Sequence, residues 1–443
     1  MKSKLVKPAT AKSEERRILV YADWAWLKER PALMGSLYGN SVRGSEVFSF
    51  EYEGAWLKSA DAQTLDPELS FFGGRQYAKA ENFGLFMDSS PDRWGRTVMQ
   101  RREALEARAE GRGTRTLTSS DYLLGVDDAH REGALRFKRA EDGPFLDDRT
   151  PADQPSPPIA TIRELEAASE EIERGGRIEK VELVKLLLAP GSSLGGSRPK
   201  SGVVNTDGSL WIAKFPSRND TYDMGAWEEV VLVLAQQCGV VVSEGYSRRF
   251  SGRWRSFLTK RFDRASSGDR VHFASAMALL GRKDGDGADT GVSYLDMAQL
   301  LTSHGSQANT DLPQLWRRIV FNVCVSNVDD HLRNHGFLLT PNGWALAPAY
   351  DMNAVPHAGQ GLSLNIDAHS NALDLDLVLS VAGYFRVGKN AREIAGDVAA
   401  KVAKWQTVAE KVGLNRDERE EMSSAFQAAE TFIEHPAAAA RRG

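Results

Sequence analysis

The residues best suited to chemistry stand in the run Asn327-Val-Asp-Asp-His-Leu-Arg-Asn334 and at Asp351. Asp329 and Asn334 are separated by four residues, and a hairpin predicted over 336–346 separates them from Asp351. Protein kinases carry a catalytic Asp and a metal-binding Asn at this spacing on one loop, followed by a second metal-binding Asp. The spacing therefore predicts a site for phosphoryl transfer.

This spacing has a physical reason. Asp329 would orient and deprotonate an attacking hydroxyl, while Asn334 turns back toward a metal held between phosphates. Mg²⁺ prefers oxygen ligands and keeps several waters, so Asn334 and Asp351 are sufficient protein ligands when phosphates supply the rest. An Asp and an Asn at this spacing would, alone, be read as an ordinary polar loop at a helix end. When the hairpin and Asp351 are added, a phosphoryl-transfer site becomes the preferred interpretation.

A strand lysine and an acidic residue on the next helix form the second half of such a site. Trp211-Ile-Ala-Lys214-Phe supplies the lysine on an apolar strand, and Glu228, or Glu229 beside it, opens the following apolar helix. An ammonium facing the interior needs a partner, because an unpaired buried charge is costly. The alternative is an edge-strand lysine that points to water.

A glycine and serine loop, Pro190-Gly-Ser-Ser-Leu-Gly-Gly-Ser-Arg-Pro-Lys200, precedes this strand. Gly195 and Gly196 permit the close approach and positive φ with which backbone N–H groups wrap phosphates. It is not a Walker A loop, because Pro199 stands where the second glycine should be. Without the downstream motif, the loop would be read as a flexible connection.

Composition and charge limit the remaining possibilities. The chain has 443 residues, 42% hydrophobic and 26% charged, which is typical of globular proteins and excludes disordered and fibrous classes. A net charge of −4 argues against a general nucleic-acid binder, and the two cysteines are too few for a disulfide framework. No apolar run is long enough to cross a membrane, so we expect a cytoplasmic protein without a membrane partner.

The predicted elements divide the chain into five parts. Residues 141–158 contain five prolines and five acidic residues, the composition of a linker or exposed loop. We expect a flexible tail (1–15), an N-terminal subdomain (16–140), this linker (141–158), an N-lobe with the glycine loop (159–262) and a helical C-lobe with the catalytic loop (263–443). Strands are expected at 17–21 and 47–52, and a helix up to Ala109 is expected after the turn Ser89-Ser-Pro91. Thr161 and Glu164 have capping-box spacing.

Taken together, these motifs resemble the HipA family, serine/threonine kinases that act as toxins of bacterial toxin–antitoxin pairs and are associated with persistence. The resemblance covers nearly the whole chain and implies an α+β, two-lobed protein-kinase-like fold with an extra N-terminal β-rich subdomain and a mostly helical C-terminal lobe. It rests on the strands from Ile18, Phe83-Gly-Leu-Phe-Met-Asp-Ser-Ser-Pro-Asp-Arg-Trp-Gly95, Ser193-Leu-Gly-Gly-Ser-Arg-Pro-Lys200, Ile212-Ala-Lys214, Arg261-Phe-Asp-Arg264, Asn327 to Asn334, and Tyr350-Asp351.

The resemblance implies a role for each matching residue. Asp329 is similar to the catalytic aspartate, Asn334 and Asp351 to the Mg²⁺ ligands, and Ser193 to a serine whose autophosphorylation silences the kinase. The ATP site that it implies comprises Gly195, Gly196, Ser197, Arg198, Pro199, Lys200, Lys214, Lys260, Arg261, Phe262, His331, Asn334, Tyr350 and Asp351. From the residues alone, His331 is interpreted as a support of the catalytic loop, because phosphoryl transfer needs no histidine as base or metal ligand.

The resemblance also implies partners. Family members phosphorylate a translation component, notably an aminoacyl-tRNA synthetase, and are often restrained by a helix-turn-helix antitoxin of the HipB type, through which DNA is contacted only indirectly. The chain departs from the family where a His-Gln-Glu-Asp run is common, because it reads His272-Phe-Ala-Ser275, and at Arg198-Pro199, where a Gln-Glu pair is frequent. Two alternatives therefore stay open: a catalytically weak or inactive scaffold that binds an antitoxin on DNA, and a small-molecule kinase of the aminoglycoside phosphotransferase type.

Overall fold

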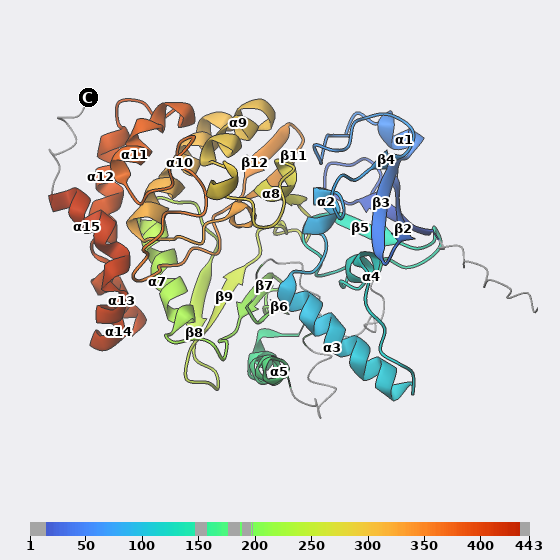
Figure 1. Cartoon of the computed structure of the whole chain (residues 1–443), viewed down its shortest axis with the longest axis horizontal. Helices are drawn as coiled ribbons and strands as arrows, with labels where there is room; N and C mark the ends of the chain where they lie inside the picture. The colour runs from blue at the N-terminus through green and yellow to red at the C-terminus, as the bar shows by residue number, and fades with distance from the viewer. Residues whose placement is uncertain (1–14, 147–156, 176–186, 188–195, 197, 435–443) are drawn as a thin grey trace, which may run out of the picture.

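The computed structural model describes residues 15–146, 157–175, 187, 196 and 198–434. Within these residues the chain forms three β-sheets, each in a different part of the molecule. Figure 1 shows the first sheet at one end, the last helices of the chain at the other, and the second sheet between them. None of the described helices is both long and apolar enough to span a bilayer.

The first sheet is antiparallel and has the order β4-β3-β2-β1-β5. Its strands are β1 (Arg16–Ala22), β2 (Ala32–Val42), β3 (Ser45–Tyr52), β4 (Gln76–Tyr77) and β5 (Leu135–Lys138). The two-residue turn between β2 and β3 has positive φ at Arg43 and Gly44, which matches the twist of the flanking strands. Both predicted strands in this region are confirmed, and β2 and β5 were not foreseen.

Four helices follow or flank this sheet: α1 (Gly54–Leu57), α2 (Gly84–Asp88), α3 (Arg93–Ala109) and α4 (Ser119–Leu124). The predicted helix after Pro91 is α3. Asp92 caps it, because its Oδ1 accepts a hydrogen bond from the backbone N–H of Gly95 at 2.6 Å. Pro91 has no N–H to donate, so the chain ends α2 before it and begins a new helix at the cap.

The second sheet has the order β6-β7-β9-β8 and forms the N-lobe. It comprises β6 (Lys200–Val204), β7 (Leu210–Lys214), β8 (Gly245–Arg248) and β9 (Ser256–Lys260), with α5 (Ile162–Arg174) and α7 (Met224–Gln237) beside it. The predicted cap of α5 is wrong: a 3₁₀ turn, Ile159–Thr161, precedes the helix. The Thr161 hydroxyl therefore donates to the carbonyl of Pro158 at 2.8 Å and caps nothing.

Helix α3 packs on the N-lobe although it belongs to the N-terminal part of the sequence. Trp94 and Val98 lie in one buried cluster with side chains of α5 and of the second sheet, among them Leu165 and Phe215. Figure 1 shows α3 and α5 next to β6 and β7. The apolar contacts therefore tie the segment before the predicted linker to the N-lobe sheet.

The C-lobe is mostly helical, as predicted. A small antiparallel sheet comprises β10 (Phe273–Ser275), β11 (Gly336–Thr340) and β12 (Gly343–Leu346). The helices are α8 (Ala276–Leu279), α9 (Tyr294–His304), α10 (Ala308–Cys324), α11 (Leu375–Ser380), α12 (Ala391–Val402), α13 (Trp405–Val412), α14 (Arg416–Met422) and α15 (Gln427–Glu434), with 3₁₀ segments Ala288–Thr290, Leu332–Asn334, Ala382–Phe385 and Ser423–Phe426. Cys238 and Cys324 are buried free thiols, as expected.

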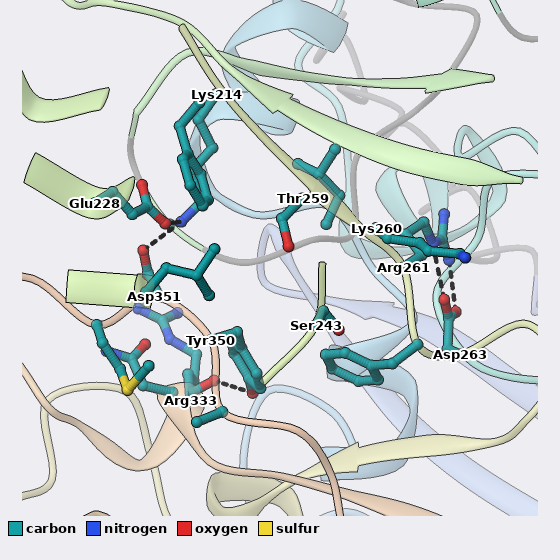
Figure 2. A pocket seen from close by; sticks show the side chains of 18 of the residues that line it. Lys214, Glu228, Ser243, Thr259, Lys260, Arg261, Asp263, Arg333, Tyr350 and Asp351 are labelled. Atoms are coloured by element: carbon teal, nitrogen blue, oxygen red, sulfur yellow. Dashed lines mark hydrogen bonds and ion pairs between the residues drawn. The ribbon is translucent and has the colours of Figure 1, made fainter. Parts of the chain in front are cut away.

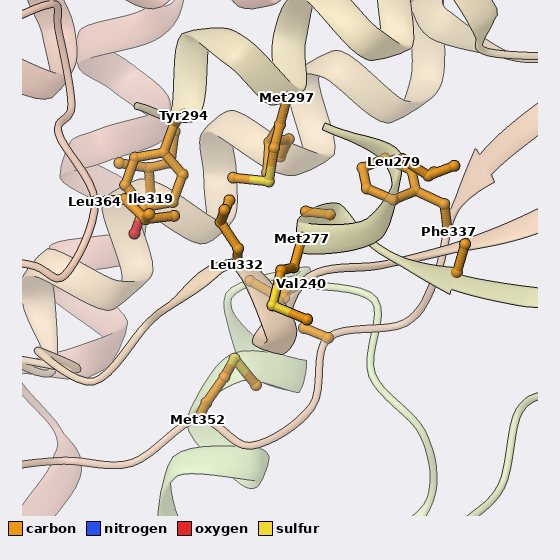
Figure 3. Packing of buried hydrophobic residues seen from close by; sticks show 14 of the residues in the cluster. Val240, Met277, Leu279, Tyr294, Met297, Ile319, Leu332, Phe337, Met352 and Leu364 are labelled. Atoms are coloured by element: carbon orange, nitrogen blue, oxygen red, sulfur yellow. The ribbon is translucent and has the colours of Figure 1, made fainter. Parts of the chain in front are cut away.

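The C-lobe core anchors the loop that follows α10. Leu332 lies in the main apolar cluster with Met277, Met297 and Ile319 (Figure 3). These side chains come from α8, α9 and α10, so the loop is held by packing from several helices. A loop whose middle residue is buried in this way is fixed relative to the helices that surround it.

A buried group of charges joins the end of β9 to the N-terminal sheet. Arg261 donates to the two carboxylate oxygens of Asp263 at 2.8 and 2.6 Å, and to the carbonyls of residues 130–131. Asp263 also accepts from the N–H of Gly133 and pairs with Arg264 at 2.7 Å. Although burial opposes ionisation, the two guanidinium groups hold the pKa of Asp263 well below its usual range.

Asp263→Asn should lower the free energy of unfolding by about 3–5 kcal/mol, because it leaves buried guanidinium groups without their counter-charge. The pKa of Asp263 is depressed in the folded state. Its contribution is therefore complete above the unfolded pKa of about 3.9 and is lost as the pH falls toward the folded value. Urea titrations at neutral and acidic pH measure both effects.

The matched control is Asp269→Asn, which removes a solvent-exposed pair with Arg30 at 2.7 Å. Exposed pairs contribute little, so this variant should be far less destabilised than Asp263→Asn. Equal losses in the two variants would contradict a structural role for the buried charges.

Candidate active site

One lysine joins the two lobes at the bottom of a cavity. The Nζ of Lys214, at the end of β7, lies 2.5 Å from Oε1 of Glu228 on α7 and 2.7 Å from Oδ1 of Asp351 in the C-lobe. Figure 2 shows the three side chains pointing toward one another. The alternative partner, Glu229, instead accepts hydrogen bonds from the backbone N–H and hydroxyl of Ser247.

The charges in this group favour the ionised forms of Lys214 and Asp351. Burial disfavours the Lys214 ammonium, but the charges of Asp351 and Glu228 outweigh it and raise the lysine pKa. Burial likewise opposes ionisation of Asp351, and the charge of Lys214, with smaller contributions from Lys200 and His331, brings its pKa below the usual range. Burial raises the pKa of Glu228. The charge of Lys214 acts in the opposite direction, but the neighbouring Asp351 carboxylate partly cancels it. Asp351 is therefore the more firmly ionised acid.

The backbone at Asp351 has an unusual conformation. Its φ is +57°, in the left-handed region that non-glycine residues seldom occupy. Ser326, at the start of the catalytic loop, has φ of +50°. Such conformations persist where surrounding structure imposes them and are concentrated at functional sites. Both bends lie on the segments that carry the predicted site residues.

The catalytic loop is held by its own polar residues. The Asn334 side-chain amide donates to the carbonyl of Asp329 at 3.0 Å, which leaves its carbonyl oxygen available as a ligand. Asp330, the next residue of this loop, is buried. Its Oδ2 accepts a hydrogen bond from the Tyr294 hydroxyl at 2.5 Å and lies 2.8 Å from Nε2 of His335. The contact with His335 helps to keep the pKa of Asp330 below its usual value despite burial.

The cavity next to Lys214, here called the inner cavity, encloses about 930 Å³ outside protein atoms, including open solvent. Its lining is largely apolar, with polar groups at intervals (Figure 2). It includes Ile212, Leu232, Ser243, Phe257, Thr259, Phe262, Tyr350 and Met352, together with Lys214, His331, Asn334 and Asp351. A concave apolar pocket with a few convergent polar groups is typical of a small-molecule or cofactor site.

A second, open depression adjoins it and is here called the outer cleft. It shares Gly196, Lys214, His331 and Asp351 with the inner cavity and adds Arg93, Arg198, Lys200, Asp284, Asp329 and Gln360. Asp329 is exposed in this cleft, although partial desolvation by the surrounding protein still raises the pKa of its carboxyl group. The nearby negative charge of Asp351 acts in the same direction, while His331 opposes it.

The structure thus brings the three predicted oxygen-bearing residues to adjoining walls. Asn334 and Asp351 both line the inner cavity, and Asp329 and Asp351 both line the outer cleft. An ionised carboxylate and an amide oxygen on one cavity wall are hard donors of the kind Mg²⁺ prefers. The residues present therefore fit the predicted metal.

The predicted nucleotide-contacting residues divide into four groups. The first lines one or both cavities: Gly196, Lys200, Lys214, Phe262, His331, Asn334, Tyr350 and Asp351, together with Arg198, which lines the outer cleft while pairing with Asp220 at 2.6 Å. Lys260 and Arg261 line the inner cavity, but their charged ends bind Glu244 and Asp263. Pro199 is buried beside the loop. Ser193, Gly195 and Ser197 lie outside the described residues.

Some lining residues were not predicted from the sequence. Ser243 and Thr259 line the inner cavity, and Glu132 reaches it from the N-terminal part of the chain. Burial raises the pKa of Glu132 well above its usual value. The apolar patterns around these residues are those of ordinary strands and turns, so no signal in the sequence distinguishes them.

Two lobes, with a lysine–glutamate pair and an aspartate-bearing loop between them, define a protein-kinase-like α+β fold. The sequence profile described as HipA-like C-terminal domain matches residues 192–430, more than half of the chain. The chain belongs to this HipA-like family.

Two curated relatives match parts of the sequence. A Sinorhizobium fredii (strain NBRC 101917 / NGR234) protein described as "Putative kinase Y4mE" is 26% identical over 208 residues, 42% of this chain and 48% of its own length. A Haemophilus influenzae (strain ATCC 51907 / DSM 11121 / KW20 / Rd) protein described as "Putative kinase" is 28% identical over 184 residues, 37% of this chain and 53% of its own length. The chain spans about half the length of these relatives.

The fold is similar over nearly all of the chain to a solved structure. A chain of the Shewanella oneidensis MR-1 toxin–antitoxin complex of HipA, HipB and operator DNA matches with a TM-score of 0.60 and 16% identity. The match covers 94% of this chain and 97% of that one. The likeness confirms the predicted fold, including the N-terminal β-rich part.

The catalytic loop offers a test of which residues support the fold. Asp330→Asn should lower the free energy of unfolding by about 3 kcal/mol, because it weakens two buried hydrogen bonds to a carboxylate. Asp329→Asn in the same loop should change it by less than about 1 kcal/mol, because the Asp329 side chain is exposed. Urea denaturation followed by tryptophan fluorescence measures both variants. A larger loss in Asp329→Asn would contradict this division of roles.

Proposed function

We propose that the chain is an ATP- and Mg²⁺-dependent kinase that transfers the γ-phosphoryl group to a serine or threonine hydroxyl of a protein. One observation carries this proposal: Lys214 is bonded to Glu228 of its own lobe and to Asp351 of the other lobe, beside the cleft that contains Asp329. This is the arrangement in which a kinase holds ATP between its lobes. The apolar inner cavity would accept the adenine and ribose.

Each residue has a defined task in this reaction. Lys214 binds the α- and β-phosphates, and Glu228 holds the lysine in place. Asp329 orients the acceptor hydroxyl and accepts its proton as the oxygen bonds to the γ-phosphorus and ADP leaves. Mg²⁺, held by Asn334 and Asp351, would neutralise charge on the phosphate oxygens.

The acceptor is proposed to be a protein segment because Asp329 lies in the outer cleft, which is open and polar. By family membership, we infer that the substrate is a translation component such as an aminoacyl-tRNA synthetase, and that the chain is the toxin of a toxin–antitoxin pair. The likeness to a chain from a complex with HipB and operator DNA supports a helix-turn-helix antitoxin as partner, with DNA contacted through it. Ser193 is proposed as the autophosphorylation site.

Asp329→Ala and Asp351→Ala should each reduce phosphate incorporation from labelled ATP by at least about a hundredfold, because they remove the proton acceptor and a metal ligand. Asp269→Asn, on an exposed surface pair, serves as the control and should label like the wild type. A phosphoproteome of cells that express the wild type, compared with the Asp329 variant, identifies the substrate. Equal labelling by the wild type and both site variants would contradict the proposal, and phosphorylation confined to small molecules would favour the aminoglycoside-kinase alternative.

Ser193→Ala should prevent the mass increase of one phosphoryl group that the wild type gains with ATP. A new phosphate near the glycine loop adds roughly −1.5 to −2 charges beside the nucleotide phosphates, which is why it would inhibit. Intact-mass spectrometry after incubation with Mg²⁺ and ATP measures this change, with Asp329→Ala as the inactive control. Persistence of the heavier species in Ser193→Ala would place the modification elsewhere.

A further inference from the structure

The N-cap residue of α3 places a carboxylate against Lys200, which lines the outer cleft. Oδ2 of Asp92 lies 3.0 Å from Nζ of Lys200, and both side chains are only 4% exposed. The other carboxylate oxygen of Asp92 accepts the capping hydrogen bond from Gly95. One carboxylate therefore joins a helix of the N-terminal part to a lysine of the N-lobe.

Lys200 occupies a position next to the phosphate-binding elements. It is the first residue of β6, and its Cα is paired with that of Lys214 across the sheet. A Cβ added to Gly196, which has φ of +104°, would lie 2.7 Å from Nζ of Lys200. Lys200 thus lies next to Gly196 and lines the outer cleft with Asp329 and Asp351.

The position of Asp92 is itself fixed by packing. Trp94 donates from Nε1 to the carbonyl of Lys200 at 2.9 Å, so α3 bonds to both the backbone and the side chain of this residue. Trp94 and Val98 also lie in the apolar cluster of the N-lobe. The Asp92 carboxylate is fixed by its capping hydrogen bond and by the packing of α3 on the N-lobe, so it can hold the flexible Lys200 side chain in one orientation.

We propose that Asp92 is a positioning residue for phosphoryl transfer, which holds the Lys200 ammonium next to Gly196, at the end of the site where the γ-phosphoryl group is transferred. This inference rests on the proposed kinase function and makes α3, outside the two kinase lobes, a part of the active site. Without Asp92, the buried Lys200 ammonium would turn to Asp351, the nearby anion that is needed for Mg²⁺. The effect should fall on the transfer step, because Lys200 lines the cleft that contains Asp329.

Asp92→Asn tests the role, because asparagine still caps a helix but carries no charge. We expect kcat to fall by about tenfold or more, while KM for ATP changes by less than about threefold. Adding Asp92→Asn to Lys200→Met should have almost no further effect, because the two residues would act as a unit. If the asparagine variant folds poorly, Asp92→Ser replaces it, because serine also retains a capping oxygen, and the same fall in kcat is expected.

Asp121→Asn is the matched control. Asp121 is a similarly buried, ion-paired carboxylate of the N-terminal part, with Oδ2 2.8 Å from Nη1 of Arg115, and it lies outside both cavities. It should keep the wild-type kcat even if its melting temperature falls. A wild-type kcat in Asp92→Asn, or independent losses that multiply in the double variant, would overturn the proposal and leave the ion pair a structural contact only.

A second measurement separates this inference from the kinase assignment. In nucleotide-free protein, a small amine-acylating reagent should modify Lys200 several-fold faster in Asp92→Asn than in wild type, with the exposed Lys58, outside both cavities, as the internal reference, as read by peptide mass spectrometry. Asp121→Asn should not change the ratio. An unchanged ratio in Asp92→Asn would show that Asp92 does not hold the lysine. A raised ratio in a protein that transfers no phosphate would refute the kinase function and, with it, the catalytic purpose of the contact.

Discussion

The structure depends on one buried ammonium that is shared by two carboxylates. Lys214 cannot be desolvated without a counter-charge, and Glu228 and Asp351 supply it from different lobes. A buried ion pair contributes little net stability once desolvation is counted, but it strongly penalises arrangements that separate the charges. The relative placement of β7, α7 and the segment after β12 is therefore specified by the same group that would bind the nucleotide phosphates.

The N-terminal part of the chain follows the same physical rule at two other places. Arg261 and Asp263 bind it to the end of β9, and Asp92 and Lys200 bind it to the start of β6. A displaced N-terminal part would separate the buried Lys200 from Asp92 and would remove the hydrogen bonds that Arg261 and Asp263 make to the backbone of residues 130–133. This explains why the first sheet and α3 are integral to the kinase-like body, and why Glu132 can reach the inner cavity from outside the two lobes.

The sequence was informative where the chemistry depends on local spacing. Asp329 and Asn334 lie on one short loop and Asp351 lies just after a hairpin, so their proximity follows from chain geometry. Choosing between Glu228 and Glu229 required the direction of α7, because neighbouring helical residues point to different sides. Asp92 and Glu132 could not be assigned at all, because each meets its partners across long sequence separations. The prediction that Thr161 caps α5 was wrong because the chain forms a 3₁₀ turn there, in which the Thr161 hydroxyl donates to the carbonyl of Pro158.

The catalytic loop shows how the fold accommodates a locally unfavourable site. Positive φ at Ser326 and Asp351 opposes folding, and the pKa of the Asp329 carboxyl group is raised by partial desolvation and by the charge of Asp351. Directly beside them, Asp330 receives hydrogen bonds that favour its charged form, and Leu332 is buried in the C-lobe core. Because these stabilising groups alternate with the reactive ones along a single loop, the loop keeps its position although its reactive carboxylate is exposed. Alternation of this kind lets Asp329 be tuned for reaction while Asp330 and Leu332 maintain the geometry around it.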